Sequence, residues 1–324
     1  MREALAPLRG RRIGLHLPLS RGMVKGAERA AEIGATALQI FSDNPTAWRR
    51  RSEPPAELAA FRQKLAELDI APLAIHGPYL VNLAGADEEY WSRSVATLIG
   101  DLRMATLYGA RFVNVHIGSH RGAGVTVGTR RVADGLAAVL GETPEGGPRL
   151  ILENSAGGGD GLGATVEELE GILHAAAAAG VDLTRVGFCL DTAHLWGAGF
   201  DVGRPEVVDQ LLADFDARLG PQQLAMIHLN DSRSPLGSHA DRHEHIGAGL
   251  IGREGMRAFL CHPRLAGVPI FVEAPGMEEG YDTVNMERVR LLIAGRDLPS
   301  LPPEAFALRG RTRGAPQRSE EEPA

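Results

Sequence analysis

Imidazole and carboxylate side chains recur along this sequence at the ends of short apolar runs. Neutral imidazole and carboxylate are the ligands that suit Zn²⁺ when thiolate is scarce, and the chain has two cysteines, Cys189 and Cys261. Ser42 to Asn44 add further polar groups after another such run. In chain order the imidazole and carboxylate side chains are His16, His76, His116, Glu153, Asp191, His194, His228, Asp231 and Glu273, and the loop after the seventh run adds Asp241 and His243.

These side chains are more numerous than one metal ion requires. Zinc commonly takes three or four ligands, so a set of nine from this group, with one carboxylate shared, suits two or three ions. Metal ions about 3.5–4 Å apart serve the hydrolysis of phosphodiesters, because they bind phosphate oxygens, lower the pKa of water and stabilise the leaving oxygen. The residue types therefore point to metal-dependent phosphoryl chemistry.

The elements that must position these groups alternate regularly. Strand-like apolar runs are separated by segments with helical periodicity, which is typical of an α/β fold of the (β/α)8 TIM-barrel type. Active sites in such barrels lie at the carboxyl ends of the strands, where the polar residues above are found. The expected strands are 13–18, 37–41, 73–78, 112–118, 149–155, 186–191, 224–230 and 269–274, and the expected helices are 26–34, 56–68, 88–108, 130–140, 165–179, 204–219, 254–260 and 286–293.

The spacing of the strands leaves no room for a second domain. We expect a single barrel domain over residues 11–296, preceded by an N-terminal extension at 1–10. The C-terminal residues 297–324 include RGRTRGAPQRSEEEPA, which lacks apolar periodicity. We expect this tail to be partly disordered.

Composition narrows the functional classes further. The 324 residues are 44% hydrophobic and 23% charged, as in ordinary globular proteins. No apolar run approaches the roughly 20 residues of a membrane span, and the charged N-terminus lacks a secretory signal, so we expect a cytoplasmic protein with no membrane partner. The net charge of −7 argues weakly against nucleic acid, but a local arginine patch can coexist with it.

Six segments of the sequence resemble signature segments of the endonuclease IV family, zinc-dependent apurinic/apyrimidinic endonucleases of the xylose-isomerase-like barrels. They are IHGPYLVNLA, VNVHIGSH, LILENSAGGGDGLG, CLDTAHLWGAGFD, IHLNDSRSPLGSHADRHEHIGAGLIG and PIFVEAPG. The resemblance runs from about residue 13 to residue 276. Its most specific part is DRHEHIGAGLIG, where Asp241 and His243 precede a glycine pattern that generic barrels do not share.

The resemblance implies three zinc ions per chain. His76, His116 and Glu153 would hold one ion, and Glu153 would bridge to a second that is completed by Asp191, His228 and Glu273. His194, Asp241 and His243 would hold the third. The implied reaction is a DNA-repair step. It hydrolyses the phosphodiester on the 5′ side of an abasic site and leaves a 3′-hydroxyl and a 5′-deoxyribose phosphate. A metal-bridging hydroxide would be the nucleophile, and Glu153 and Glu273 would be the catalytic residues that orient it.

The same resemblance implies how damaged duplex is recognised. Tyr79 and Leu80 match a pair of side chains that the family inserts into the gap left by the missing base, and Asn44, Ser119 and Arg242 match further DNA-binding positions. One departure is Thr46, where relatives often have arginine; the following residues 49–51 are arginines that could supply the charge instead. A monomer and 3′-phosphodiesterase activity are also implied. The sequence leaves Mn²⁺ open beside Zn²⁺.

Two other functions fit parts of the pattern. Sugar isomerases and epimerases on similar barrels use one or two metals held by equivalents of Glu153, Asp191, His228 and Glu273, and they do not need the other five ligands. A zinc-binding damage sensor without catalysis would keep the whole set. The glycine-rich residues 157–163 lack the Lys-Ser/Thr ending of a P-loop, so no nucleotide cofactor is expected. His16, His120, His239 and His245 are expected to support the ligands or the loops.

Overall fold

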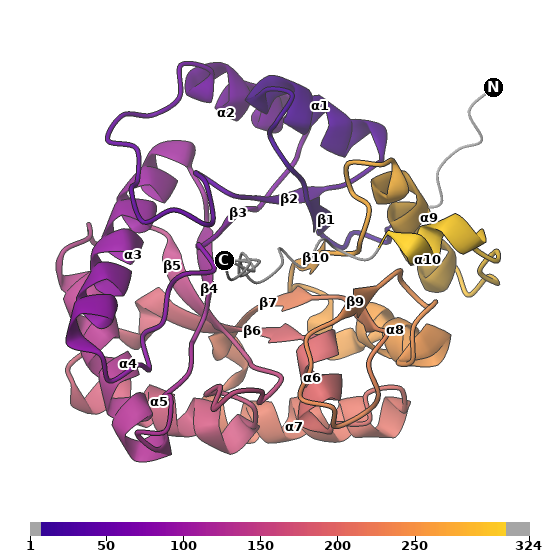
Figure 1. Ribbon diagram of the computed structural model, residues 1–324. Coiled ribbons are helices and arrows are strands. Elements are labelled where there is room, and N and C mark those ends of the chain that lie inside the picture. Colours follow the sequence, from indigo (N-terminus) through magenta and orange to yellow (C-terminus); the bar gives the residue numbers. More distant parts are fainter. Residues whose placement is uncertain (1–7, 309–324) are drawn as a thin grey trace, which may run out of the picture.

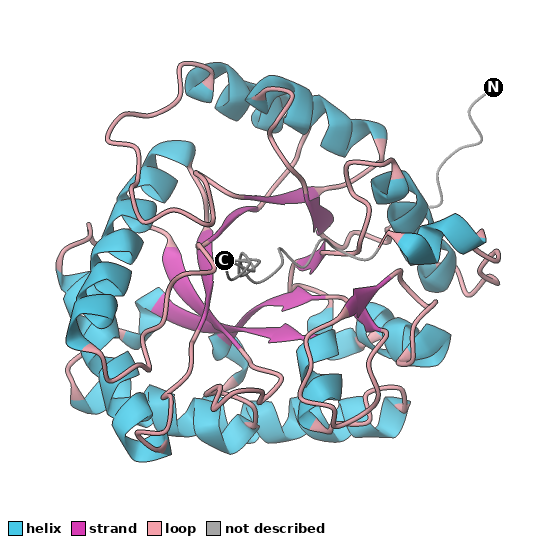
Figure 2. Ribbon diagram, viewed as in Figure 1, coloured by secondary structure: helices cyan, strands magenta, loops and turns pink. Residues whose placement is uncertain are grey.

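The computed structural model describes residues 8–308, and these form a closed parallel barrel (Figure 1). A ring of strands is enclosed by helices (Figure 2), which confirms the expected α/β barrel in a single domain. β1 closes the ring by pairing with the last barrel strand, with Gly14 opposite Phe271. The barrel strands are β1 (Ile13–His16), β2 (Ala37–Ile40), β3 (Leu73–His76), β4 (Phe112–His116), β5 (Arg149–Glu153), β6 (Val186–Asp191), β7 (Leu224–His228) and β10 (Ile270–Val272).

The helices cover the outside of the barrel through one large apolar core. Thr165 caps helix α5 (Val166–Ala178) by accepting a hydrogen bond from the Glu168 amide, while the Glu168 side chain accepts from the amides of Gly163 and Ala164. Single-turn 3₁₀ helices (Leu183–Arg185, Pro221–Gln223, Pro263–Leu265) precede β6, β7 and β10. The helices are α1 (Met23–Glu32), α2 (Leu58–Glu67), α3 (Glu88–Tyr108), α4 (Val125–Gly141), α5 (Val166–Ala178), α6 (Thr192–Ala198), α7 (Pro205–Leu219), α8 (Gly252–Cys261), α9 (Tyr281–Ile293) and α10 (Pro303–Ala307).

Three kinds of element were not expected from the sequence. Two short strands, β8 (Asp231–Ser232) and β9 (His243–Glu244), form an antiparallel pair between β7 and α8. Helix α6 begins directly after β6, and six of its seven residues are buried, so it lacks an amphipathic pattern. Helix α10 lies within the stretch expected as a tail; residues 1–7 of the expected extension and 309–324 of the tail lie outside the described residues.

A second, smaller apolar cluster is separate from the core under the helices. These residues come from seven strands and, because side chains alternate between the two faces of a strand, they fill the interior of the barrel. The consecutive pair Ala225 and Met226 lies where the register of β7 against β6 shifts by one residue. We call this cluster the floor: Ala37, Ala74, Phe112, Ile151, Cys189, Ala225, Met226 and Phe271. Among the helices of residues 8–308, none has both the length and the apolar character needed to cross a lipid bilayer.

Candidate metal centre

Polar side chains form the next layer of the barrel interior above the floor. Each lies two residues after a floor residue, or after Gly14 in β1, and therefore points to the same side of its strand. This layer takes one residue from every barrel strand or from the position directly after it. Its members are His16, Gln39, His76, Asn114, Glu153, Asp191, His228 and Glu273.

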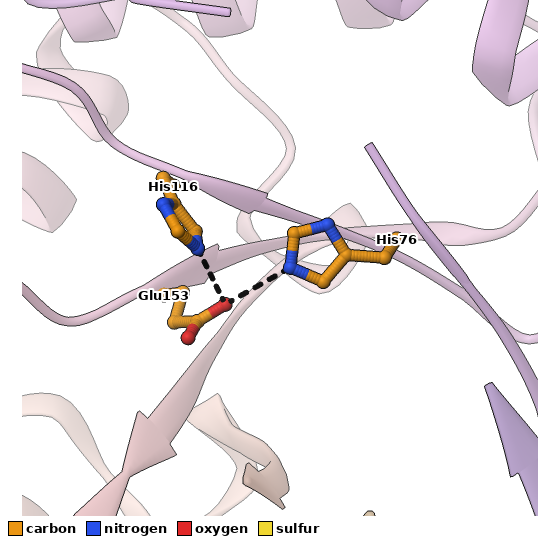
Figure 3. Close-up of side chains that lie close together, drawn as sticks. All are labelled: His76, His116 and Glu153. Atoms are coloured by element: carbon orange, nitrogen blue, oxygen red, sulfur yellow. Dashed lines mark ion pairs between the residues drawn. The ribbon is translucent and has the colours of Figure 1, made fainter. Parts of the chain in front are cut away.

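The structure brings the nine expected ligands into one connected set. Three groups have ligand atoms within 4.8 Å of one another: His76, His116 and Glu153; Glu153, Asp191, His228 and Glu273; and Asp191, His194 and His243. Figure 3 shows the first group, in which one oxygen of Glu153 faces both imidazoles. Asp241, half exposed, joins the third group through its two carboxylate oxygens, which lie 3.3 Å from His194 Nε2 and 3.0 Å from His243 Nε2.

In three of the candidate histidine ligands, a hydrogen bond at Nδ1 orients the ring so that Nε2 faces the candidate metal centre. Nδ1 of His76 lies 2.7 Å from the carbonyl of Gly77, and Nδ1 of His194 and His243 lie 2.8 and 3.0 Å from the carbonyls of Asn154 and Glu273. A carbonyl can only accept, so in the neutral imidazole Nδ1 carries the proton and Nε2 presents its lone pair. This is the arrangement that a metal ion requires of a histidine ligand.

The spacing of the ligand atoms also fits zinc. Zn–N and Zn–O bonds of about 2.0–2.2 Å in a tetrahedron place neighbouring ligand atoms about 3.4 Å apart. Nε2 of both His76 and His116 lies 3.6 Å from Glu153 Oε2, and His228 Nδ1 lies 3.3 Å from Glu273 Oε2. The donor types and their separations therefore suit a metal ion in each group.

Three buried amides that the sequence analysis missed hold the carboxylates. Gln39 donates to Glu273 Oε1 at 2.6 Å, Asn114 donates to Glu153 Oε2 at 2.5 Å, and Asn230 donates to Asp191 Oδ2 at 2.6 Å. His16 also reaches Glu273, with its Nδ1 3.2 Å from Oε1. Neutral donors at these places stabilise the ionised carboxylates without adding a competing charge.

The electrostatics of the site indicate where cations belong. Burial alone would raise the pKa of Glu153, but His228 and His116 hold that pKa well below its ordinary value. Burial would lower the pKa of His243, but Asp241 and Asp191 raise it to about 10. Ionised carboxylates at this density require positive charge beside them, which bound metal ions would provide in place of protons.

The glycine pattern of the most specific motif surrounds a buried carboxylate outside this cluster. Asp231 accepts hydrogen bonds from the amides of Ser232, Gly249, Ile251 and Gly252. A Cβ at Gly249 would lie 2.5 Å from both Asp231 Oδ1 and the Ser232 carbonyl, so this position requires glycine. Asp231 thus pins residues 249–252 to β8 and stabilises the hairpin whose second strand carries His243.

The glycine-rich loop at 157–163 is packed against the segment between β8 and β9. His239 Nδ1 lies 3.1 Å from the Ala156 carbonyl, and a Cβ at Gly158 would lie 2.5 Å from the His239 carbonyl. On its other side, the hydroxyl of Ser119 donates to the Gly159 carbonyl at 2.5 Å. These glycines permit close approach within the protein, and His239 has the supporting role expected of it.

Two cavities open from the candidate metal centre. One of about 750 Å³ is lined by Tyr79, Arg242 and Arg233, and one of about 340 Å³ by Tyr79, Leu80 and Ser119. Both include His116, Glu153, His194 and Asp241 in their linings. The expected DNA-binding residues Tyr79, Leu80, Ser119 and Arg242 therefore lie beside the ligands, whereas Asn44 is exposed on the loop after β2 and lines neither cavity.

The arginines after Thr46 are not equivalent. Arg50 forms a bidentate ion pair with the buried carboxylate of Asp101, at 3.0 and 3.1 Å, and donates to the Asn44 carbonyl. Its charge is therefore neutralised inside the protein. Arg51 lies 3.6 Å from Asp43, and Arg49 is exposed.

Comparison with known proteins identifies the class of the barrel and then its family. The family described as xylose isomerase-like TIM barrel matches residues 27–292. Probable endonuclease 4 of Methanoculleus marisnigri is 38% identical over 281 residues, which are 86% of this chain and 98% of that protein. The chain therefore belongs to the endonuclease IV family, and the expectation that it is a nuclease is confirmed.

Solved structures agree with this assignment. The crystal structure of endonuclease IV from Thermus thermophilus has a TM-score of 0.76 and 37% identity, and the match covers 88% of this chain and 99% of that one. A D-psicose 3-epimerase structure has a TM-score of 0.63 at 15% identity, covering 88% and 97% of the two chains. That second likeness shows a shared fold alone.

Proposed function

We propose that this protein is a DNA-repair endonuclease that hydrolyses the phosphodiester 5′ to an abasic site in duplex DNA. The products are a 3′-hydroxyl and a 5′-deoxyribose phosphate, and the same site would remove blocking groups from 3′ ends. We further propose that the protein works in the cytoplasm as a monomer with three zinc ions. Its membership of the endonuclease IV family and the printed names of its relatives support this reading.

The observation that carries the proposal is the surplus of ligands over what sugar chemistry needs. Glu153, Asp191, His228 and Glu273 alone make one of the three ligand groups. An epimerase would use that group and leave the other histidines without a purpose. The overlap of three groups through Glu153 and Asp191 instead favours a cluster of ions that share carboxylates.

The ligand residues divide the work of the site in this proposal. His76, His116 and Glu153 would hold the first ion, Glu153, Asp191, His228 and Glu273 the second, and His194, Asp241 and His243 the third. Zinc ions bound there supply Lewis acidity toward phosphate oxygens and lower the pKa of water. Glu153 and Glu273, both on the cavity of about 750 Å³, would orient the attacking water by accepting its hydrogen bonds.

Recognition of damage would depend on the mouth of the cavities. Tyr79 is 60% exposed although it is a large aromatic residue, and Leu80 beside it is half-buried. An apolar wedge that unstacks a base step costs a few kcal/mol, and this cost is lower where a base is missing. Exposed Tyr79 would therefore enter an abasic gap more readily than an intact stack, with Asn44, Ser119 and Arg242 contacting the backbone.

The test is incision of a duplex with one tetrahydrofuran abasic analogue, which cannot undergo lyase chemistry. We expect a single cut 5′ to the analogue, together with close to three zinc equivalents by elemental analysis. A parallel assay with ketohexoses should show no epimerisation. Full metal occupancy without incision would refute the nuclease proposal, and epimerisation of a sugar would favour its rival.

A further inference from the structure

An arginine outside the expected site residues lies on the smaller cavity. Arg121 follows β4, is exposed, and lines the cavity of about 340 Å³ together with Glu153, His194 and Asp241. Within residues 8–308 no carboxylate forms an ion pair with it. The carboxylates in the same lining are the two candidate metal ligands Glu153 and Asp241, so the cation of Arg121 is available to a bound anion.

The guanidinium is held in place by aromatic rings from two other parts of the chain. Its Cζ lies 5.3 Å from the ring centroid of Tyr90, at the start of α3, a distance typical of a cation–π contact. Tyr90 in turn packs edge-on against Trp48, from the loop after β2, with centroids 5.0 Å apart. This packing reduces the entropy that an arginine loses on binding a ligand.

The backbone that carries Arg121 is equally constrained. Arg121 has φ of 46°, and Gly118 before it has φ of 102°; a Cβ at Gly118 would lie 2.1 Å from Asn82 Oδ1. The side chain of Asn82 both accepts from the Ser119 amide and donates to the Ser119 carbonyl, each at 3.0 Å. The loop therefore presents Arg121 in a defined direction.

The neighbouring Ser119, which we propose above contacts the DNA backbone, would have to exchange an internal hydrogen bond to do so. Its hydroxyl donates to the Gly159 carbonyl at 2.5 Å and accepts from the Arg121 amide at 3.2 Å. The side-chain donors of this loop that remain available beside the cavity are those of the Arg121 guanidinium. An arginine without a carboxylate partner, stacked on an aromatic ring, is suited to a phosphate.

We propose that Arg121, supported by Tyr90, binds a backbone phosphate of the DNA next to the phosphodiester that is cut. This inference rests on the proposed function. Arg233 and Arg242 line the larger cavity, which adjoins the same candidate metal ligands. Arginines from the two cavities therefore lie at separate places around the candidate metal centre. This local positive charge would allow a chain with a net charge of −7 to bind a polyanion such as DNA.

The experiment measures incision of the abasic-analogue duplex by the zinc-loaded full chain at several salt concentrations. Arg121→Ala should raise KM about tenfold, which corresponds to one charged contact, with a smaller effect on kcat. The slope of log kcat/KM against log salt should fall by about 1, because one phosphate fewer is neutralised. Arg121→Lys should retain the wild-type slope, since it retains the charge.

Two further variants separate charge from structure. Tyr90→Leu should raise KM but keep the salt slope, because it removes the support and leaves the cation. Arg130→Ala is the matched control: this arginine is exposed on α4 and is absent from the lining of the cavity, so its KM and slope should equal those of the wild type.

The outcomes distinguish this inference from the proposed function. If Arg121→Ala has the KM and salt slope of the Arg130→Ala control while both proteins cut normally, the phosphate contact is refuted and the nuclease stands. If the wild-type protein neither binds nor cuts the duplex, both the phosphate contact and the proposed nuclease function are refuted.

Discussion

The side chain of Gln39 connects two ligands of the same candidate metal ion, His228 and Glu273. Its carbonyl oxygen lies 2.9 Å from His228 Nε2, and its amide nitrogen donates to Glu273 Oε1 at 2.6 Å. Because that carbonyl can only accept, Nε2 carries the proton and Nδ1 of His228 is the nitrogen that faces the carboxylates. A neutral, fully buried residue thus selects which nitrogen is offered to the metal.

Replacing Gln39 by leucine should weaken metal binding. The change leaves a buried N–H of His228 without an acceptor and removes a donor from Glu273, and loss of such outer hydrogen bonds typically costs 10–100-fold in metal affinity. Competition with a chromophoric chelator would measure the change. Circular dichroism of the metal-free variant would check that the barrel is intact; unaltered zinc affinity in a folded variant would contradict the role of Gln39.

The variant Glu153→Gln should abolish incision while DNA binding survives. Glu153 belongs to two of the three ligand groups, and an amide has one oxygen and no charge with which to bridge two ions. We expect a rate loss on the order of 10³-fold or more. Glu142→Gln, an exposed carboxylate at the end of α4, is the control, and unchanged turnover of Glu153→Gln would exclude the bridging role.

Substitution of Tyr79 by alanine should reduce the preference for damaged over intact duplex. An exposed ring contributes little to the stability of the free protein, so the free energy of unfolding of the variant should stay within about 0.5 kcal/mol of the wild-type value. Tyr79→Phe keeps the ring and should keep the preference. Binding titrations with matched abasic and intact duplexes measure the ratio; equal ratios for the alanine variant and the wild type would remove Tyr79 from damage recognition.

Arg50→Met should destabilise the fold. The side chains of Arg50 and Asp101 are 11% and 2% exposed, and removing one partner of a buried ion pair typically costs about 3–5 kcal/mol. The double variant Arg50→Met with Asp101→Leu should recover part of the lost stability, because it leaves no unpaired buried carboxylate. Urea unfolding is the measurement, with Arg49→Ala as the exposed control; similar midpoints for the Arg49 and Arg50 variants would show that the ion pair contributes nothing.

The barrel was accessible to sequence reasoning, and so were the candidate ligands at the strand ends, because both depend on local patterns. Apolar runs that end in a histidine or carboxylate mark the carboxyl end of most strands, and closure of the barrel brings those ends together. Gln39 and Asn114 were missed because a single amide within an apolar strand has no distinctive neighbours. The signal that would have found them is their position two residues after a floor residue, at the same place as Glu153 in β5.

Other features depend on contacts between distant parts of the chain. In sequence, any of the arginines at 49–51 could supply charge to DNA, but in the structure Arg50 is paired with Asp101 on α3. Strands β8 and β9 have two residues each, too few to show a period of two. The glycines near 249 form the most specific motif in the sequence, but only the structure shows that they surround the side chain of Asp231.

The distribution of the ligands over separate strands has a mechanical consequence. His76 and His116 precede the exposed turn at residues 144–146, and Glu153 follows it, so an ion in that group would cross-link the chain on both sides of the turn. A protease cut there should leave two fragments that stay together while metal is bound and separate more easily in a chelator. A metal ion in this group would thus act as a reversible cross-link between the two parts of the chain on either side of the turn.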